Sequence, residues 1–246
     1  MLTKYVQKTN GRYILSNAAI EEIATKILQR YSPLHLRQPM PLNIVDFMMN
    51  HLGLLIKHKH IGEPTSGILG LIVMSDSVPI PSVDSNGEQT VVEETFGTVL
   101  ISPTLLTADN IPRCRYTEAH ESAHFILHQP FYRWLDKKYE TKRERYSSCF
   151  ACRTVGKPIL KPRTEEDWRE WQADKLAAAL LMPKGPFTEY VRQITDAMGI
   201  RSGYLNMENA DDAIAYTHVM KHIANAFGVS RTAAEIRMKH LGLLVA

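Results

Sequence analysis

Two histidines and a glutamate within five residues carry the clearest chemical signal in this sequence. His120 and His124 are four positions apart. On a helix, this spacing places both imidazoles on nearly the same face, about 6 Å apart along the axis, so that both can bind one Zn²⁺. Glu121 lies between them and can face a water molecule at the metal. The pattern predicts a zinc hydrolase, although histidines that merely share a helix face produce it as well.

A helix must carry this motif for the spacing to have chemical meaning. Pro112 suits the first turn of such a helix, and Pro130 is a suitable stop. The residues between the two prolines are largely apolar around the motif, and they predict a buried helix: Ala119, Ala123, Phe125, Ile126 and Leu127.

A catalytic zinc ion usually takes three protein ligands and keeps one position for water. His128 continues the histidine series, but it lies about 12 Å along the helix axis from His120, too far to share one ion. The pattern with a third histidine six residues after the second fails, because Leu127 and Pro130 stand where it requires Gly and His. The third ligand must come from another segment.

A second predicted helix offers that ligand. Thr164 with Asp167 three residues later resembles a helix N-cap, and the helix should run through Leu181 to Met182-Pro183. Glu170 and Asp174 are four residues apart and share one face of it. Glu170 could bind the metal while Asp174 accepts a hydrogen bond from the distal nitrogen of a ligand histidine. The alternative is an ordinary amphipathic helix with a solvated acidic face.

The two motifs together resemble the ImmA/IrrE family of bacterial metallo-endopeptidases. The resemblance rests on residues 120–128 and 170–183 and extends over residues 40–246. It departs from the family at Ser122-Ala123, where a bulky apolar residue and then Gly are common. The resemblance implies an α+β, zincin-like metallopeptidase fold in which a small mixed sheet packs on the HExxH helix. A C-terminal helical segment resembling a helix-turn-helix should follow.

The expected domains are a helical extension at 1–40, a metallopeptidase domain at 41–200 and a helical subdomain at 201–246. The rest of the coarse pattern predicts helices at 18–31 and 42–51 and strands at 54–57, 68–74 and 98–101. We expect an exposed hairpin or excursion within 75–97 and a basic insertion at 136–163. Val99–Ser102 is either a substrate-binding edge strand or a purely structural strand.

The resemblance also implies a role for each site residue. His120, His124 and Glu170 are expected to bind one zinc ion per chain, with manganese or iron as alternatives. Glu121 is the expected general base, and Asp174 the hydrogen-bond partner of a ligand histidine. Candidates for stabilising the oxyanion are residues that also suit packing or surface positions: Tyr204, His218 and His222. The implied substrate is a helix-turn-helix transcriptional repressor of a mobile element or stress regulon.

Composition predicts a cytoplasmic protein with no membrane partner. The chain has 246 residues, 44% of them hydrophobic, without a long apolar span or the apolar core of a signal peptide. Its formal charge of +3 does not by itself indicate a nucleic-acid partner. The three cysteines suit a reducing compartment. Cys149 and Cys152 form a Cys-x-x-Cys; either they are free thiols, or Cys114 and His128 complete a second zinc site with them.

Residues 223–240 support rival functions. A helix, a glycine-containing turn and a second helix are predicted there, as in a helix-turn-helix, and Arg231, Arg237 and Lys239 could contact phosphates. The chain could then be a DNA-binding regulator with a vestigial or structural zinc site. A partner-binding module in a toxin–antitoxin-like pair is the other alternative.

Overall fold

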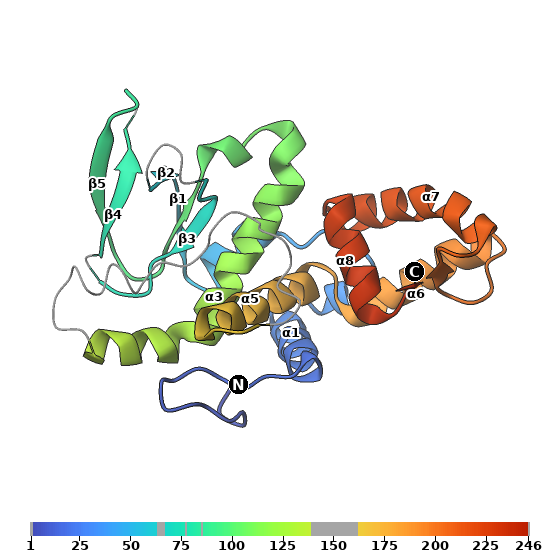
Figure 1. Ribbon diagram of the computed structural model, residues 1–246, viewed down its shortest axis with the longest axis horizontal. Coiled ribbons are helices and arrows are strands. Elements are labelled where there is room, and N and C mark those ends of the chain that lie inside the picture. The colour runs from blue at the N-terminus through green and yellow to red at the C-terminus, as the bar shows by residue number, and fades with distance from the viewer. Residues whose placement is uncertain (1, 63–66, 77, 85, 139–161, 246) are drawn as a thin grey trace. The chain divides into compact units, whose positions relative to one another are not determined.

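The computed structural model describes residues 2–62, 67–76, 78–84, 86–138 and 162–245, which form helices and small sheets (Figure 1). The predicted α+β class is confirmed. Contacts group the chain into a first unit, Met1–Ile20 with Ile44–Ala177, and a second unit, Glu21–Asn43 with Ala178–Ala246. The three domains expected from the sequence stay a prediction. No helix within the described ranges has the length and apolar content needed to cross a membrane.

A three-stranded sheet in the first unit packs against helix α3 (Ile111–Lys138). Its strands are β1 (Leu55–His58), β3 (Gly70–Ile72) and β6 (Thr98–Ile101), in the order β1-β6-β3. β1 runs parallel to β6, and β3 runs antiparallel to it. The prediction that Val99–Ser102 is an edge strand is therefore wrong, because β6 has a partner strand on each side.

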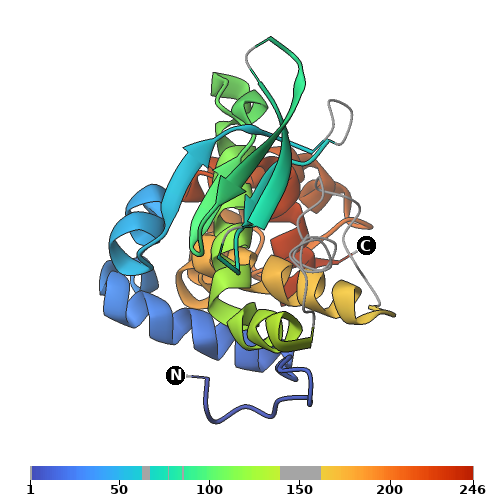
Figure 2. The same ribbon diagram turned by 90° about the vertical axis from the view of Figure 1, so that its left-hand side faces the viewer.

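A hairpin forms within residues 75–97, as predicted (Figure 2). β4 (Val78–Val83) pairs with β5 (Gln89–Glu94), and it also pairs with β2 (His60–Ile61); both pairings are antiparallel. A buried apolar cluster connects this second sheet to the first: Ile61, Leu71, Val73, Ile80 and Leu100.

Helix α3 carries the HExxH motif and continues for two turns past Pro130. The prediction that Pro130 ends this helix is wrong. Proline lacks an N–H and removes one helical hydrogen bond. However, Phe131, Tyr132 and Leu135 beyond it are buried, and their burial favours continuation of the helix. Two short 3₁₀ turns, Pro103–Leu105 and Ala108–Asn110, precede α3.

Helix α5 (Glu165–Leu181) begins as the sequence predicts. The Asp167 N–H donates to Thr164 Oγ1 at 3.0 Å, and the Thr164 N–H donates to Asp167 Oδ2 at 2.9 Å. This reciprocal cap satisfies main-chain donors that no carbonyl of the helix can reach. The predicted N-terminal helices also form, as α1 (Asn17–Tyr31) and as α2 (Ile44–Asp46) continued by the π-helix η2 (Phe47–His51).

The second unit is mainly helical. It contains the 3₁₀ turn η1 (Pro33–Leu36), the helices α6 (Lys184–Ala197), α7 (Ala210–Phe227) and α8 (Arg231–Leu241), and the paired parallel strands β7 (Leu205–Asn206) and β8 (Leu244–Val245). Gly228 ends α7 in the left-handed conformation, with φ 64°, and the Ser230 hydroxyl caps α8 by accepting from the Ala233 N–H. The order of helix, glycine turn and helix is the predicted one.

The guanidinium of Arg237 is buried in the second unit. It pairs with the carboxylate of Glu21, with 2.9 Å between Nη2 and Oε2, and donates to the main-chain carbonyl of Met182 at 2.9 Å. The prediction that Arg237 contacts phosphates is wrong, because a buried guanidinium that is already paired cannot also reach a nucleic acid. Lys239 is exposed and pairs with Glu235.

Candidate metal centre

Helix α3 directs the two motif histidines toward α5. The side chain of His120 is 12% exposed, and His124 is fully buried. Their Nε2 atoms lie 3.0 Å apart, because four residues on a helix bring both imidazoles to the same face. The spacing argument from the sequence thus describes the actual placement of these two side chains.

Helix α5 supplies the two predicted acidic residues. Glu170 Oε2 lies 3.2 Å from His120 Nε2, and Glu170 Oε1 lies 3.3 Å from His124 Nε2. Asp174 Oδ1 lies 2.9 Å from His120 Nδ1 and also accepts from the hydroxyl of Tyr116 at 3.5 Å. Two helices separated by a long stretch of sequence therefore bring all four predicted side chains together.

The protonation pattern and spacing of these groups fit a metal ion. A carboxylate only accepts, so the Asp174 contact assigns the proton of a neutral His120 to Nδ1 and leaves a lone pair on Nε2. That lone pair faces His124 and the Glu170 carboxylate. With metal–ligand bonds of about 2.0–2.2 Å, tetrahedral ligands lie about 3.3–3.6 Å apart. The observed contacts of 3.0, 3.2 and 3.3 Å are close to that range.

His120, His124 and Glu170 can therefore hold a metal ion, since each offers one ligand atom and these atoms all lie within 4.8 Å of one another. Burial raises the pKa of Glu170, but the imidazoles of His124 and His120 outweigh it, and the net pKa lies below the ordinary value. Glu170 is thus an anion wherever the imidazoles are free to bind metal.

Glu121 is fully buried, and strand β3 lies close against it at Gly70. A Cβ atom on Gly70 of β3 would lie 2.5 Å from Thr117 Cγ2 and 2.7 Å from Glu121 Oε1. Both distances are far below an ordinary contact, so glycine is the residue that fits here without a shift of its neighbours. Gly70 therefore allows β3 to cover Glu121 directly, one position along α3 from His120.

Sequence reasoning missed two buried residues of this centre, His128 and Gln172. Nδ1 of His128 lies 3.0 Å from Nδ1 of His124, and its Nε2 lies 3.1 Å from Oε1 of Gln172. Burial, together with the neighbouring His124, lowers the pKa of His128 well below its usual value, so its imidazole is neutral. The signal was the histidine series itself. Spacing excluded His128 as a ligand but not as a partner of one.

The candidates for stabilising the oxyanion belong to the second unit. Tyr204 is 40% exposed, and the exposed rings of His218 and His222 on α7 stack with their centroids 4.2 Å apart. The metal-binding group belongs to the first unit. A role for these three residues at the metal centre stays a prediction.

Among the cysteines, the structure describes Cys114 alone. Cys149 and Cys152 lie outside the described residues, as does most of the predicted basic insertion. Burial, reinforced by Glu118, raises the pKa of Cys114 to about 12, so that this thiol stays protonated near neutral pH and is a poor metal ligand. Among the residues described, no second group of three histidine, cysteine or acidic side chains is placed to hold a metal ion.

No family model matches the chain, and a search of curated proteins found no match. The resemblance to the ImmA/IrrE family therefore rests on the motifs, and the activity that it implies is a proposal.

Proposed function

We propose that this chain is a zinc-dependent endopeptidase with a zincin-like site made of HExxH and a downstream glutamate. The observation that carries the proposal is the convergence of His120, His124 and Glu170, with Glu121 buried beside them. Two histidines and one carboxylate form a known ligand set of catalytic zinc, which keeps a fourth position for water. Manganese and iron accept the same donors, so the identity of the metal must be measured.

The side chains of the centre have distinct proposed roles. Bound zinc would polarise the scissile carbonyl and lower the pKa of a water molecule. Glu121 would take a proton from water and pass it to the leaving amine. Asp174 would hold the Nδ1–H of His120, which keeps Nε2 of that imidazole directed at the other two ligands.

The outer edge of β3 is our candidate for the substrate-binding strand, in place of β6. β3 ends the strand order of its sheet. Leu69 and Val73, on either side of it, bond to the β6 segment, so alternation directs the peptide groups of Gly70 and Ile72 to the outer edge. An extended peptide can add to such an edge through main-chain hydrogen bonds. Because Gly70 packs against Glu121, this would bring a peptide bond near the general base.

The proposed substrate is a helix-turn-helix repressor, as the family resemblance implies. Direct DNA binding through residues 223–240 has less support, because Arg237 is buried in an ion pair and Lys239 is paired with Glu235. A partner-binding module, as in a toxin–antitoxin-like pair, makes a different prediction. A pull-down would then recover an intact partner instead of a cut one.

A single substitution tests the proposed chemistry. Glu121→Gln keeps the size of the side chain and removes the base, so we expect the metal to stay bound while cleavage of a co-expressed candidate repressor is lost. Glu166→Gln on the exposed start of α5 is the matched control and should cleave normally. Metal analysis and mass spectrometry of the repressor provide the two readouts. Cleavage by Glu121→Gln at the wild-type rate would overturn the mechanism.

A further inference from the structure

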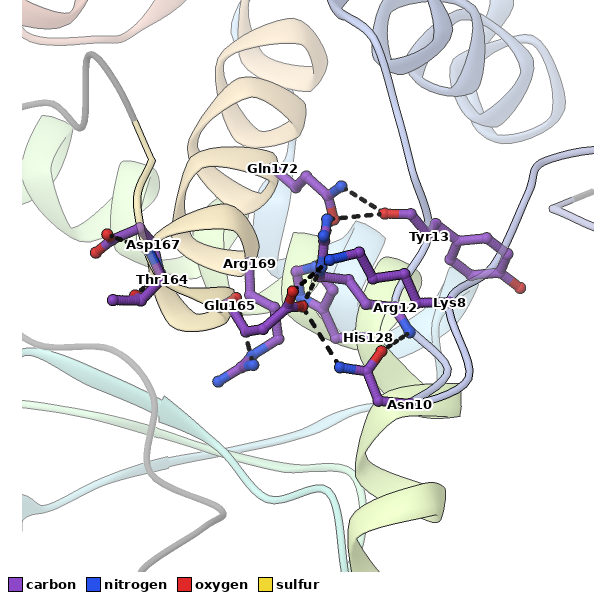
Figure 3. Close-up of polar contacts among 10 residues, drawn as sticks. All are labelled: Lys8, Asn10, Arg12, Tyr13, His128, Thr164, Glu165, Asp167, Arg169 and Gln172. Atoms are coloured by element: carbon purple, nitrogen blue, oxygen red, sulfur yellow. Dashed lines mark hydrogen bonds and ion pairs between the residues drawn. The ribbon is translucent and has the colours of Figure 1, made fainter.

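The metal ligand His124 is the first member of a buried chain of polar contacts. From its Nδ1 the chain passes to His128 Nδ1 at 3.0 Å and from His128 Nε2 to Gln172 Oε1 at 3.1 Å. Gln172 Nε2 then donates to the main-chain carbonyl of Tyr13 at 2.8 Å. Figure 3 shows the far end of this chain, with Gln172 between His128 and the Tyr13 carbonyl. The three side chains are fully buried.

The direction of each hydrogen bond in this chain follows from the acceptor at its far end, the main-chain carbonyl of Tyr13. A main-chain carbonyl only accepts, so Gln172 must turn its amide NH₂ toward Tyr13 and its oxygen toward His128. The facing nitrogen of His128, Nε2, must then carry the proton. With its single proton on Nε2, the neutral imidazole of His128 has its lone pair on Nδ1, which faces His124. His124 must therefore donate from Nδ1, which leaves the lone pair of a neutral His124 on Nε2.

That lone pair lies where the proposed metal would bind, because Nε2 of His124 faces His120 and Glu170. We propose that His128 and Gln172 are positioning residues that hold His124 in the tautomer and orientation needed for metal binding, with the Tyr13 carbonyl as their fixed end. This inference rests on the proposed metal site. Hydrogen-bond partners of a ligand histidine typically contribute 10- to 100-fold to metal affinity.

The segment that carries the Tyr13 carbonyl is attached to both helices of the site. The side chain of Arg12 is 5% exposed and donates from Nε to Glu165 Oε2 of α5 at 2.6 Å (Figure 3). Lys8 binds the same carboxylate. Gly11 lies against α3 so closely that a Cβ there would be 2.5 Å from the Pro130 carbonyl oxygen. The fixed end is therefore held by side chains and by close packing.

Zinc affinity measured by chelator competition tests the proposal. His128→Phe and Gln172→Met fill similar space without completing the chain, and we expect each to raise the zinc Kd about 10- to 100-fold. His128→Asn restores an acceptor for the Nδ1–H of His124 and should bind zinc more tightly than His128→Phe. His35, a buried histidine of the second unit that contacts the Pro41 carbonyl, supplies the control: His35→Phe should leave the zinc Kd within about twofold.

Folded His128→Phe and Gln172→Met proteins with the wild-type zinc Kd would overturn the inference while leaving the proposed function intact. A wild-type chain that binds no metal would overturn both. If the variants do not fold, nitrogen-15 shifts of the histidine rings in the wild type decide. We expect a proton on Nε2 of His128 and on Nδ1 of His124. A proton on Nδ1 of His128, or on both of its nitrogens, would contradict the chain.

Discussion

Gly70→Ala adds a single methyl group, yet it should lower both the stability of the protein and its rate of cleavage. The added methyl would meet Thr117 Cγ2 at 2.5 Å and Glu121 Oε1 at 2.7 Å, whereas carbon atoms in contact normally lie about 3.5–4.0 Å apart. About 1 Å of movement is therefore needed between β3 and α3. Overpacking of this kind costs about 1–3 kcal/mol of the free energy of unfolding. A displacement of Glu121 by about 1 Å would lower the cleavage rate about 100-fold.

Urea denaturation with chelator competition separates these effects. We expect the unfolding midpoint of Gly70→Ala to fall while the zinc Kd changes little, because none of the close contacts involves a metal ligand. Gly185→Ala is the matched control. Gly185 lies in α6 with nothing within 4 Å of an added Cβ, so stability should stay level or rise by up to about 1 kcal/mol.

A second substitution separates the contact with Thr117 from the contact with Glu121. Thr117→Ser removes Cγ2 but keeps the hydroxyl, which donates to the Arg113 carbonyl at 3.0 Å. Adding it to Gly70→Ala should recover part of the lost stability. Cleavage should stay impaired, because the contact with Glu121 remains. A Gly70→Ala protein with the wild-type unfolding midpoint would refute the reasoning about close packing at Glu121.

Two further predictions concern ion pairs. Arg237→Ala should lower the free energy of unfolding by about 3–5 kcal/mol, because it leaves Glu21 without its buried partner. Lys239→Ala breaks an exposed pair with Glu235 and should lower it by less than about 0.5 kcal/mol; equal losses for the two variants in urea denaturation would contradict this. Hydrogen bonds from Arg12 and Lys8 lower the pKa of Glu165 from 4.5 to about 2. The ionised Glu165 carboxylate therefore stabilises the folded state fully above about pH 4.5, and this contribution is lost as the pH falls toward 2. Solvent screening at a carboxylate that is 42% exposed limits this effect to about 1 kcal/mol, and a Glu165→Gln variant with the wild-type pH dependence of unfolding would contradict the assignment.

Local periodicity predicted much of the candidate metal centre. The four-residue spacings of His120 with His124 and of Glu170 with Asp174 each define one helix face, and both pairs lie as that geometry requires. The helix cap at Thr164 was predicted as well, because it depends on a hydrogen bond between two residues that are three positions apart. These features depend on short stretches of chain.

The features that sequence reasoning missed depend on distant partners. β6 is central because β1 pairs with its second side, and no local pattern reveals a strand order. The requirement for glycine at position 70 arises because Glu121 packs directly against it, and the sequence does not reveal this contact. Arg237 looked like a phosphate ligand because Glu21, its partner, is more than 200 positions away in the sequence. The length of α3 was underestimated because burial beyond Pro130 offsets the missing hydrogen bond.

Metal content tests the central claim most directly. Elemental analysis of the purified wild type should find about one zinc ion per chain, and Glu170→Ala and His124→Ala should have lost it or bind it much more weakly. Glu166→Gln, an exposed acidic residue of α5, should retain the wild-type content. A wild-type chain that stays without metal after reconstitution with zinc, manganese or iron would contradict the proposed hydrolase.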